Sequence, residues 1–599
     1  MSLSISRRVF VAGASCLLAS KASFAQQRQN YDVVVYGMTS GGITAAVQAS
    51  AMGKSVVIVG GWRERHPGGM MSGGLGGTDV ESGEAFGGLS RYVISRINAA
   101  AKVADDRYSF EPRFAQSVFE DLLRDYDIPV FRSRGALRTA KTASRVTALE
   151  TVDGQVFSGR VFIDASYEGD LMALSGISTT VGREPQDGDN VLNGFRGTRM
   201  DALGSNHNFY SYRRFEKVLG KLGVDPYVVP GTPGSGLLYG IRRYPSPELG
   251  AGDKAVQAYN FRMTMTKDAA RRVALPSRPP EGFDPTRYEM LFRWINTLNE
   301  HEQITDANAA IKSYFLLHSD LGNGVFDINN FGAVSTDFIG GSWGYPQADY
   351  SAREQIWKAH ERWIRGLFYA LQYHKDARVP QPLREAFLEY GLDEMHYTDP
   401  HENDQRFWPY QLYVREARRM VNDNQVTGRD VTASDDTQPQ DTRTISTGSY
   451  NRDSHHTQRI IRSGANLLGM TETSVWNEGN FEAPSGGADK IFTIPFSSIV
   501  PRRFECSNVM SIFALSATHE AFGAIRMEMS LMQAGQSAGA AAALAAGSMA
   551  DIQDVPYDEL VTSLYVPKGA KPSVLPRFAA ARSVAANLKT SRTGEQILP

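Results

Sequence analysis

Six residues near the start of the chain have the composition and spacing of a phosphate-binding turn. They read Gly37-Met38-Thr39-Ser40-Gly41-Gly42, with Thr39 where a dinucleotide fingerprint has its second glycine. Such a turn must be tight and must bring its backbone close to a pyrophosphate. It must also open a helix whose N-terminus offers free N–H groups and a positive dipole end. The motif is degenerate, so its meaning depends on the elements around it.

The flanking residues are typical of those elements. Residues 31–36 are a β-branched apolar run that ends at Gly37, and residues 55–59 are a second such run. Apolar residues between the two runs recur at close to helical spacing. We therefore predict a strand–helix–strand unit whose first turn binds a dinucleotide.

A second glycine cluster follows at residues 68–79, which read GGMMSGGLGGTD. A flexible linker is one interpretation, but Met, Leu and Asp are not typical of linkers. Glycine lets a backbone approach another group closely. We therefore expect this segment to lie against a flat ligand.

Further along, the pattern predicts a helix over residues 110–126, a hairpin over 145–158 and a short buried strand over 161–164. Residues 186–490 have longer polar stretches and six of the seven Trp. We interpret them as a separate substrate or cap domain. Residues 491–546 return to a strand, turn and helix pattern.

A polar cluster in the predicted cap domain contains Tyr450, Asp453, His455 and His456. Adjacent histidines point in different directions, so we expect at most one of them to serve chemistry. A solvated loop explains the cluster equally well. A metal site requires three or four converging ligands, and we predict none.

Three arginines, Arg415, Arg418 and Arg419, lie on a predicted helix. Arg415 and Arg418 are three residues apart and would share a helix face. They suit either a carboxylate-bearing substrate or structural ion pairs.

The overall composition narrows the class of protein. The 599 residues include 63 Lys plus Arg and 65 Asp plus Glu, for a formal net charge of −2. This balance does not favour binding to a nucleic-acid backbone. Of the two cysteines only Cys506 lies outside the N-terminal segment, which excludes an intramolecular disulfide and cysteine-rich metal sites in a processed chain.

The N-terminal segment is typical of an export signal. Residues 6–10 read SRRVF, an apolar run follows, and residues 23–25 read SFA, a small-x-small cleavage site. This resembles a twin-arginine signal over residues 1–25. The apolar run is shorter than the about 20 residues of a membrane span. We predict a periplasmic protein with no span in the mature chain.

Several longer motifs resemble one family of flavoproteins. They are residues 36–53, 68–79, the run FIDASYEGD at 162–170, the segments 411–420 and 448–455, and SATHEAFGAIR at 516–526. Together they look like the FAD-dependent oxidoreductases labelled xanthan lyase-like. The resemblance implies an α/β fold: a Rossmann-like FAD-binding domain of the glutathione-reductase type, with an inserted α+β substrate or cap domain.

The resemblance also implies how the chain is divided. The FAD-binding domain would comprise residues 31–185 plus 491–550, the substrate domain residues 186–490, and a C-terminal tail residues 551–599.

The resemblance assigns cofactor-binding roles position by position. The FAD pyrophosphate would lie at Gly37, Thr39, Ser40, Gly41 and Gly42. The ribityl chain and flavin would lie along Gly68, Gly69, Met70, Met71, Ser72, Gly73, Gly74 and Leu75. Asp164 and Ala165 would lie near the pyrophosphate, and a helix beginning near Gly535, Gln536 and Ser537 would point its N-terminus at the flavin.

The resemblance also suggests catalytic residues. An oxidation needs a base within hydrogen-bond reach of the substrate. His519 lies in a motif that the family places beside the flavin, and it is either this base or a structural histidine. The match adds His455, Asp453 and Tyr450 from the polar cluster, and Arg526, which would stabilise charge on reduced flavin.

One departure concerns adenosine binding. The second strand of such domains normally ends in Glu or Asp, which binds the ribose, but here Val59 is followed by Gly60-Gly61. Either Glu64 or the backbone would have to substitute for this acid.

Four functions remain open. The leading hypothesis is oxidation of an alcohol or sugar-like hydroxyl by hydride transfer to FAD, with electrons passed to oxygen or to a periplasmic or membrane carrier. The alternative is oxidation of an amine or an aromatic, alkaloid-like compound. A polysaccharide lyase would leave both glycine clusters without a purpose, and the polar clusters argue against a non-catalytic cofactor or ligand binder.

Overall fold

The computed structural model describes residues 28–199, 207–209, 223–243, 245–301, 304–399, 406–432, 441–465, 471–486 and 490–577. The predicted export signal at residues 1–25 and the end of the predicted C-terminal tail lie outside these residues.

The first sheet contains the predicted strand–helix–strand unit. β1 (Arg28–Tyr36), α1 (Ser40–Ala51) and β2 (Val56–Val59) follow one another, and β1 pairs in parallel with β2. The strand order is β3-β2-β1-β6-β5-β4, and β20 also pairs with β6. The strand–helix–strand prediction is therefore confirmed, and its turn lies at the carboxyl end of the central strand.

The strand β6 (Val156–Asp164) connects distant parts of the chain. It pairs in parallel with β1 along one edge, while β5 (Arg145–Thr151) and β20 (Val509–Ser511) share its other edge. β5 and β6 form the predicted hairpin, and α4 (Pro112–Asp125) is the helix predicted over residues 110–126. Residues almost 350 positions apart thus build one sheet.

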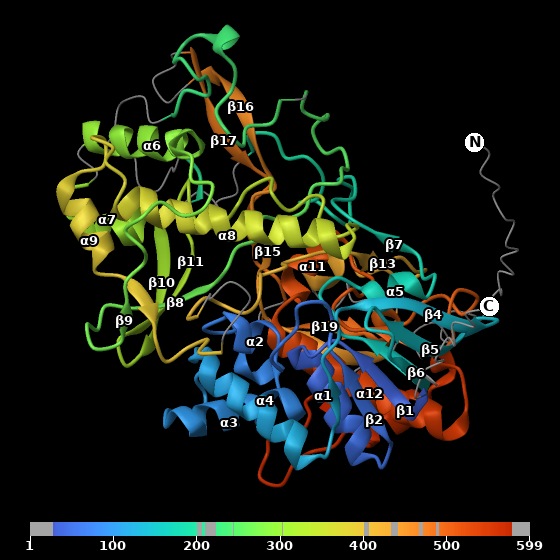
Figure 1. Cartoon of the computed structure of the whole chain (residues 1–599). Helices are drawn as coiled ribbons and strands as arrows, with labels where there is room; N and C mark the ends of the chain where they lie inside the picture. Colours follow the sequence, from blue (N-terminus) through green and yellow to red (C-terminus); the bar gives the residue numbers. More distant parts are fainter. Residues whose placement is uncertain are drawn as a thin grey trace, which may run out of the picture.

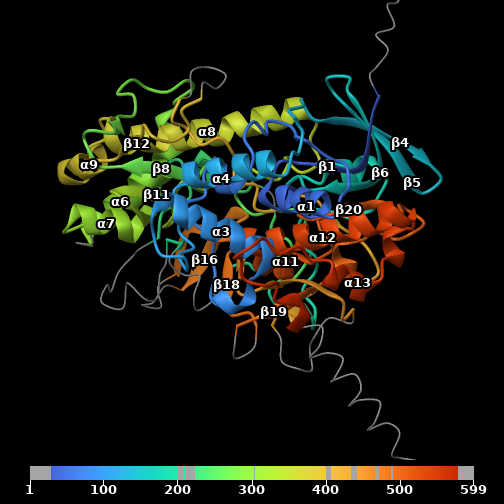
Figure 2. The same ribbon diagram turned by 90° about the horizontal axis from the view of Figure 1, so that it is seen from below.

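The helix α12 (Glu528–Ser548) packs against α1, as both views of the molecule show (Figures 1 and 2). Two glycines permit this contact. A Cβ at Gly535 would collide with the carbonyl of Gly41, and one at Gly539 with the carbonyl of Ala45. The first turn of α1 is therefore supported from behind by the C-terminal part of the chain.

A second sheet lies within the predicted cap domain, in the green and yellow part of Figure 1. Its order is β10-β11-β8-β12-β9. These strands are β8 (Met263–Thr266), β9 (Arg272–Val273), β10 (Leu316–Gly322), β11 (Val325–Asn330) and β12 (Gly391–Asp393). The helices of this region are α6 (Glu289–Glu300), α7 (Ala307–Tyr314), α8 (Tyr350–Gln372) and α9 (Gln381–Leu388).

Four two-stranded ladders complete the described strands: β7 with β13, β14 with β19, β15 with β18 and β16 with β17. Their bounds are β7 (Thr179–Thr180), β13 (Arg419–Met420), β14 (Thr444–Gly448), β19 (Phe492–Pro495), β15 (Arg452–Ser454), β18 (Phe481–Ala483), β16 (Gln458–Ala465) and β17 (Thr471–Glu478). The other elements are β3 (Val130–Phe131), β4 (Ala136–Thr142), α2 (Met70–Gly73), α3 (Gly88–Ala101), α5 (Asp170–Leu174), α10 (Gly428–Val431), α11 (His519–Ile525) and α13 (Tyr557–Thr562).

The prediction of a helix around Arg415 and Arg418 is wrong. Residues 414–418 have no regular structure and lead into the short strand β13. Arg415 is fully buried and pairs with Asp337, and Arg418 pairs with Asp170. Ion pairs with other segments therefore determine the conformation here, rather than local helical spacing.

Candidate active site and cofactor-binding region

The turn after β1 has the geometry that a dinucleotide requires. Gly37 has a φ of +113°, and a Cβ there would lie 2.7 Å from the backbone of Ala165. Thr39 caps α1: its hydroxyl accepts from the Gly42 N–H and donates to the Ala165 carbonyl at 2.8 Å. The first turn of a helix leaves N–H groups without intrahelical partners. The tight turn and the helix N-terminus thus meet at one edge of the sheet.

Asp164 ends β6 directly beside this turn and is fully buried. Its Oδ1 accepts from the Ser166 N–H at 3.0 Å, and its Oδ2 from the Met172 N–H at 2.8 Å. Burial raises its pKa to about 7, although these hydrogen bonds favour the charged form and lower the pKa. Asp164 therefore shapes the loop that supports Gly37, and Ala165 packs directly under the turn.

The second glycine cluster lies beside the first. Thr39 and Gly68 form an isolated bridge, and the N–H of Met70 donates to the Tyr167 hydroxyl at 2.8 Å. The glycines pack against protein groups: a Cβ at Gly69 would meet the Tyr167 hydroxyl, and one at Gly73 would lie 2.5 Å from Gln411.

The rest of the cluster is held in the same way. Gly74 approaches Arg262, Ser72 donates to the Pro67 carbonyl, and Met71 and Leu75 are buried. The glycines allow this segment to pack against neighbouring protein segments, and the expectation that its backbone lies against a flat ligand stays a prediction.

The helix predicted to begin near Gly535 begins at Glu528 instead. Gln536 bonds to Gln48 and to the Tyr565 carbonyl, and Ser537 bonds to the Ile445 carbonyl. These residues lie two turns inside α12 and are fully or almost fully buried. The prediction of a helix N-terminus there is wrong, because the glycines mark a helix–helix contact and not a helix start.

The true N-terminus of α12 points at the dinucleotide turn. Glu528 accepts hydrogen bonds from the Ser40 hydroxyl and, at 3.1 Å, from the Tyr167 hydroxyl. Burial raises the pKa of Glu528 to about 7. Ser40 is thus bonded to a protein carboxyl group next to the first turn of α1, a contact that the sequence motif does not reveal.

His519 is the first residue of α11 and is fully buried. Its Nδ1 lies 2.7 Å from Glu416 Oε2, and its Nε2 lies 3.0 Å from the Ser454 hydroxyl. Burial alone would raise the pKa of Glu416, but its pairing with His519 and the charge of Arg419 outweigh burial and lower that pKa. Both ring nitrogens are occupied, so the geometry favours the structural interpretation of His519.

His455 has a different environment. Its Nδ1 lies 2.8 Å from Asp337 Oδ2, and its Nε2 lies 3.6 Å from Asp453 Oδ2. Arg415 anchors the other Asp337 oxygen at 2.9 Å. Burial and the charge of Arg415 lower the pKa of His455 to about 3. The imidazole is neutral, Nδ1–H donates to Asp337, and Nε2 is left as an acceptor.

A second set of polar groups adjoins His455. Arg526 Nη2 lies 2.5 Å from Asp453 Oδ2, and its Nη1 donates to the Tyr413 hydroxyl at 2.8 Å. Burial raises the pKa of Asp453 to about 6, with Glu482 adding to the rise and Arg526 opposing it. Burial also raises the pKa of Tyr450, and Asp79 and Asp453 add to it. The structure therefore brings together the predicted residues Tyr450, Asp453, His455 and Arg526.

Asp79 connects this set to the second glycine cluster. Its side chain is reached by solvent, yet burial raises its pKa while Arg262 and Arg526 oppose the rise. Nearby, Arg262 pairs with Asp327, which also accepts from the Gly76 N–H.

Sequence reasoning did not assign Asp79, Tyr413 or the partner role of Asp337. Asp79 and Tyr413 lie within motifs that carry the family resemblance, which is the signal that would have found them. The pairing of Asp337 with His455 spans 118 positions and has no local signal.

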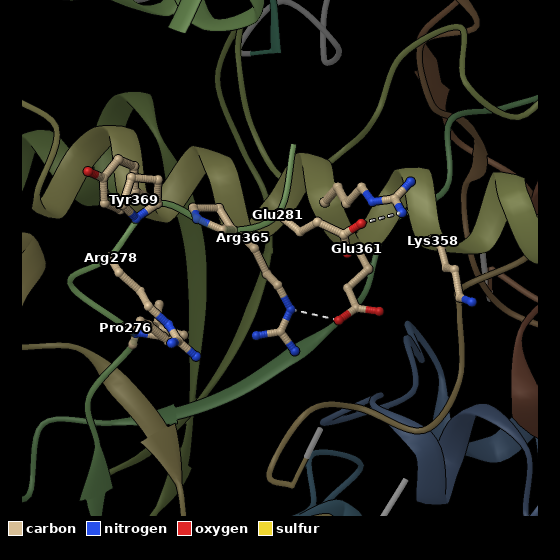
Figure 3. A pocket seen from close by; sticks show the side chains of 11 residues that line it. Pro276, Arg278, Glu281, Lys358, Glu361, Arg365 and Tyr369 are labelled. Atoms are coloured by element: carbon tan, nitrogen blue, oxygen red, sulfur yellow. Dashed lines mark hydrogen bonds and ion pairs between the residues drawn. The ribbon is translucent and has the colours of Figure 1, made fainter. Parts of the chain in front are cut away.

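A surface groove of about 770 Å³ lies away from this set of residues. It runs along α8 between a proline-rich loop and Lys358, Arg365 and Tyr369 (Figure 3). There Arg365 pairs with Glu361. None of the predicted site residues lines this groove.

Among the described residues, no helix is long and apolar enough to cross a membrane. The same part of the chain contains no group of three or more His, Cys, Asp or Glu side chains that could hold a metal ion.

The fold and site define a dinucleotide-binding protein of the mixed α/β class. The family model for FAD dependent oxidoreductases matches residues 32–564, so the chain belongs to this family. It is an enzyme, and FAD is its cofactor. The tight turn at Gly37 and the open first turn of α1 fit the pyrophosphate of this group.

Several solved flavoprotein structures match stretches of this chain. A mutant flavin monooxygenase from Stenotrophomonas maltophilia matches at 19% identity, over 23% of this chain and 38% of its own, with a TM-score of 0.18. Thioredoxin reductase from Streptococcus pyogenes matches at 17%, over 27% and 38%, with a TM-score of 0.16. L-proline dehydrogenase from P. horikoshii matches at 12%, over 26% and 59%, with a TM-score of 0.20.

These matches thus span about two fifths to three fifths of the other chains. A search of curated proteins found no match.

Proposed function

We propose that the protein oxidises an alcohol or a sugar-like hydroxyl and passes the electrons to oxygen or another acceptor. Bound FAD supplies the hydride acceptor for this chemistry. The chain must then bind the substrate, hold a base at its hydroxyl and exclude competing water. The polar residues around His455 are suited to these tasks.

The observation that carries the proposal is the Asp337–His455 pair. Arg415 and His455 both bind Asp337, which fixes the imidazole orientation and leaves Nε2 as the proton acceptor. The side chain of His455 is 14% exposed, so the ring is accessible as well as held. A substrate hydroxyl could donate a hydrogen bond to Nε2, which is unprotonated throughout the neutral pH range. A pKa of about 3 makes the ring a weaker proton acceptor than an ordinary histidine, so the proton would pass to Nε2 only as the hydride leaves the substrate.

Neighbouring groups would position the substrate. Arg526 holds Asp453 and Tyr413 in place, and Asp453 lies on the Nε2 side of His455. With a pKa near 6, Asp453 exchanges a proton within the working pH range. We infer that Asp453 and Tyr413 hydrogen-bond the substrate oxygens, and that Arg526 offsets negative charge that develops beside them.

One observation favours the alternative, an amine substrate. Asp79, Asp453 and Glu482 act on one another here, and burial is the main cause that raises the pKa values of Asp79 and Asp453. Arg526 opposes both rises, together with Arg262 at Asp79 and Arg415 at Asp453. Carboxyl groups whose charged form is disfavoured by burial would gain from a ligand with a positively charged nitrogen.

A donor panel separates the two substrates. FAD-loaded enzyme is mixed anaerobically with polyols and glycosides, aromatic alcohols, and primary and secondary amines, and the loss of visible flavin absorbance is followed. We expect reduction by a hydroxyl donor, at a rate that does not fall between pH 5 and 8 through titration of His455, because its pKa is about 3. Reduction by amines alone would reject the alcohol proposal.

Two further proposals concern cell location and architecture. We propose export by the twin-arginine route, supported by residues 6–10 and 23–25; cell fractionation of chains with Arg7→Lys and Arg8→Lys tests it. We also propose a glutathione-reductase-type FAD domain interrupted by a cap domain. Support comes from β20, which rejoins the first sheet, and from the separate sheet formed by residues 263–393.

A further inference from the structure

A groove of about 680 Å³ lies beyond the carboxyl ends of β2 and β3. It is lined by residues 62–65, 132–134, 152–153, 350–351 and 354. In open α/β sheets, ligands bind outside the carboxyl ends of the strands, and the end of the second strand carries the carboxylate that binds a nucleotide ribose. This groove is therefore placed where the adenosine end of a dinucleotide is expected, although β2 ends without an acid.

The segment after β2 folds back and brings the carboxylate of Glu64 into this groove. Arg63 has a φ of +62°, a left-handed conformation that is uncommon for residues other than glycine. The N–H of Glu64 donates to the Gly61 carbonyl at 3.3 Å, which closes a tight turn. A Cβ on Gly61 would lie 3.2 Å from the Glu64 carboxyl carbon, so a larger residue at position 61 would crowd the carboxylate.

The two carboxylate oxygens of Glu64 differ. Oε2 accepts from the N–H of Met38, in the dinucleotide turn, at 2.6 Å and from the N–H of Gly61 at 2.8 Å. No described residue donates to Oε1, while Glu64 lines the groove. One oxygen is thus committed to the protein and holds the carboxylate in place, and the other is available to a ligand.

We propose that Glu64 is the carboxylate that binds the ribose hydroxyls of the cofactor's adenosine. It reaches the site from a loop five residues beyond β2 rather than from the strand end. The proposal concerns adenosine recognition and does not depend on which substrate the enzyme oxidises.

The charges around the groove are consistent with this role. Arg65, Arg132 and Arg134 contribute positive charge, and Arg63 is paired with Glu354. Burial raises the pKa of Glu64 to about 7, against the two backbone hydrogen bonds. A ribose hydroxyl hydrogen bond to Oε1 would favour the charged form and lower this pKa.

Binding of two ADP analogues to the full chain, stripped of FAD, tests the proposal by calorimetry. ADP carries both ribose hydroxyls, and 2′,3′-dideoxy-ADP carries neither. We expect the chain to bind ADP about 10- to 100-fold more tightly, because hydrogen bonds to a charged group contribute about 1.5–3 kcal/mol. In Glu64→Ala the two affinities should become similar, and Glu64→Gln should retain part of the difference.

Glu64 also supports Met38, so Glu64→Ala will weaken binding for structural reasons as well. Such a loss affects both analogues equally and leaves their ratio unchanged, and an unchanged ratio would overturn the proposal. Tighter binding of adenosine 2′,5′-diphosphate than of ADP would also overturn it, because a phosphate would then lie where the carboxylate should repel it. The exposed Glu84, changed to Gln, is the matched control and should keep the ratio of the unaltered chain.

Discussion

His455 and His519 each pair with a carboxylate, but they differ in whether the second ring nitrogen remains available to a ligand. Each histidine bonds through Nδ1 to a buried carboxylate, Asp337 at 2.8 Å and Glu416 at 2.7 Å. Nε2 of His519 lies 3.0 Å from the Ser454 hydroxyl, and this ring is fully buried. Nε2 of His455 lies 3.6 Å from Asp453, and this side chain is 14% exposed.

This difference shows which feature of a His–carboxylate pair indicates chemistry. The carboxylate orients the ring in both cases, so its presence alone does not distinguish a base from a structural residue. What distinguishes them is whether the second nitrogen remains available to a substrate. By this criterion we propose His455 as the base, whereas His519 ties α11 to the segments that contain Glu416 and Ser454.

The largest expected effect comes from removing the base. His455→Ala should lower the rate of flavin reduction by about 10²- to 10⁴-fold, which is the usual contribution of a positioned base. Stopped-flow reduction of FAD-loaded enzyme by its donor measures this rate, and FAD content should be unchanged. His301→Ala, at the end of α6, serves as the control and should behave like the unaltered enzyme. A rate that stays within twofold in His455→Ala would remove this residue as the base.

The matching change at the other histidine should affect stability instead. His519→Ala leaves Glu416 buried without its partner, and breaking a buried pair typically costs about 3–5 kcal/mol. We expect a clearly lower melting temperature and, in the molecules that remain folded, a normal rate of flavin reduction. His519→Ala combined with Glu416→Gln should recover part of the lost stability. If the reduction rate fell while stability held, the two histidines would have to exchange roles.

A third buried group extends the comparison to acids. Glu528 has a pKa of about 7 in the folded chain and about 4.5 when exposed, because burial disfavours its charge. Its protonated form therefore stabilises the fold at low pH, and this contribution is lost as pH rises from about 4.5 through 7. Glu528→Gln removes this pH-dependent loss in the free energy of unfolding, which corresponds to roughly 3 kcal/mol.

Thermal unfolding of the FAD-free chain across this pH range measures the effect. The Gln variant should be more stable than the unaltered chain at pH 8, and the two should converge near pH 4. An equal difference at every pH would show that titration of Glu528 is not its cause.

Local sequence patterns predicted the elements of the first sheet well. The apolar run before Gly37, the helical spacing after it and the hairpin turn at Asp153-Gly154 each depend on neighbouring residues, and each was confirmed. Helix prediction failed where distant ion pairs determine the backbone, as at Arg415. It also failed at Gly535, where glycines serve a close contact with α1 and not a helix boundary.

The candidate site was predicted only in part. The cluster of Tyr450, Asp453 and His455 was visible because its members are neighbours in sequence and match a family motif. Its partners come from elsewhere: Asp337, Arg415 and Arg526 lie 118, 40 and 71 positions from His455. Such pairings depend on how the sheets and loops pack, and no local pattern encodes them.

The sequence alone determined the strand, turn and helix at the start of the first sheet and indicated the kind of ligand, because a phosphate-binding turn needs only a strand, a few small residues and a helix in succession. The tertiary structure decided which histidine is accessible and which carboxylate lines the groove beyond β2. Burial, the pKa of a side chain and the availability of a second nitrogen or oxygen all depend on groups that folding brings from distant positions. For this reason Glu64 and His455, rather than a strand-end acid and His519, emerge as the residues to test.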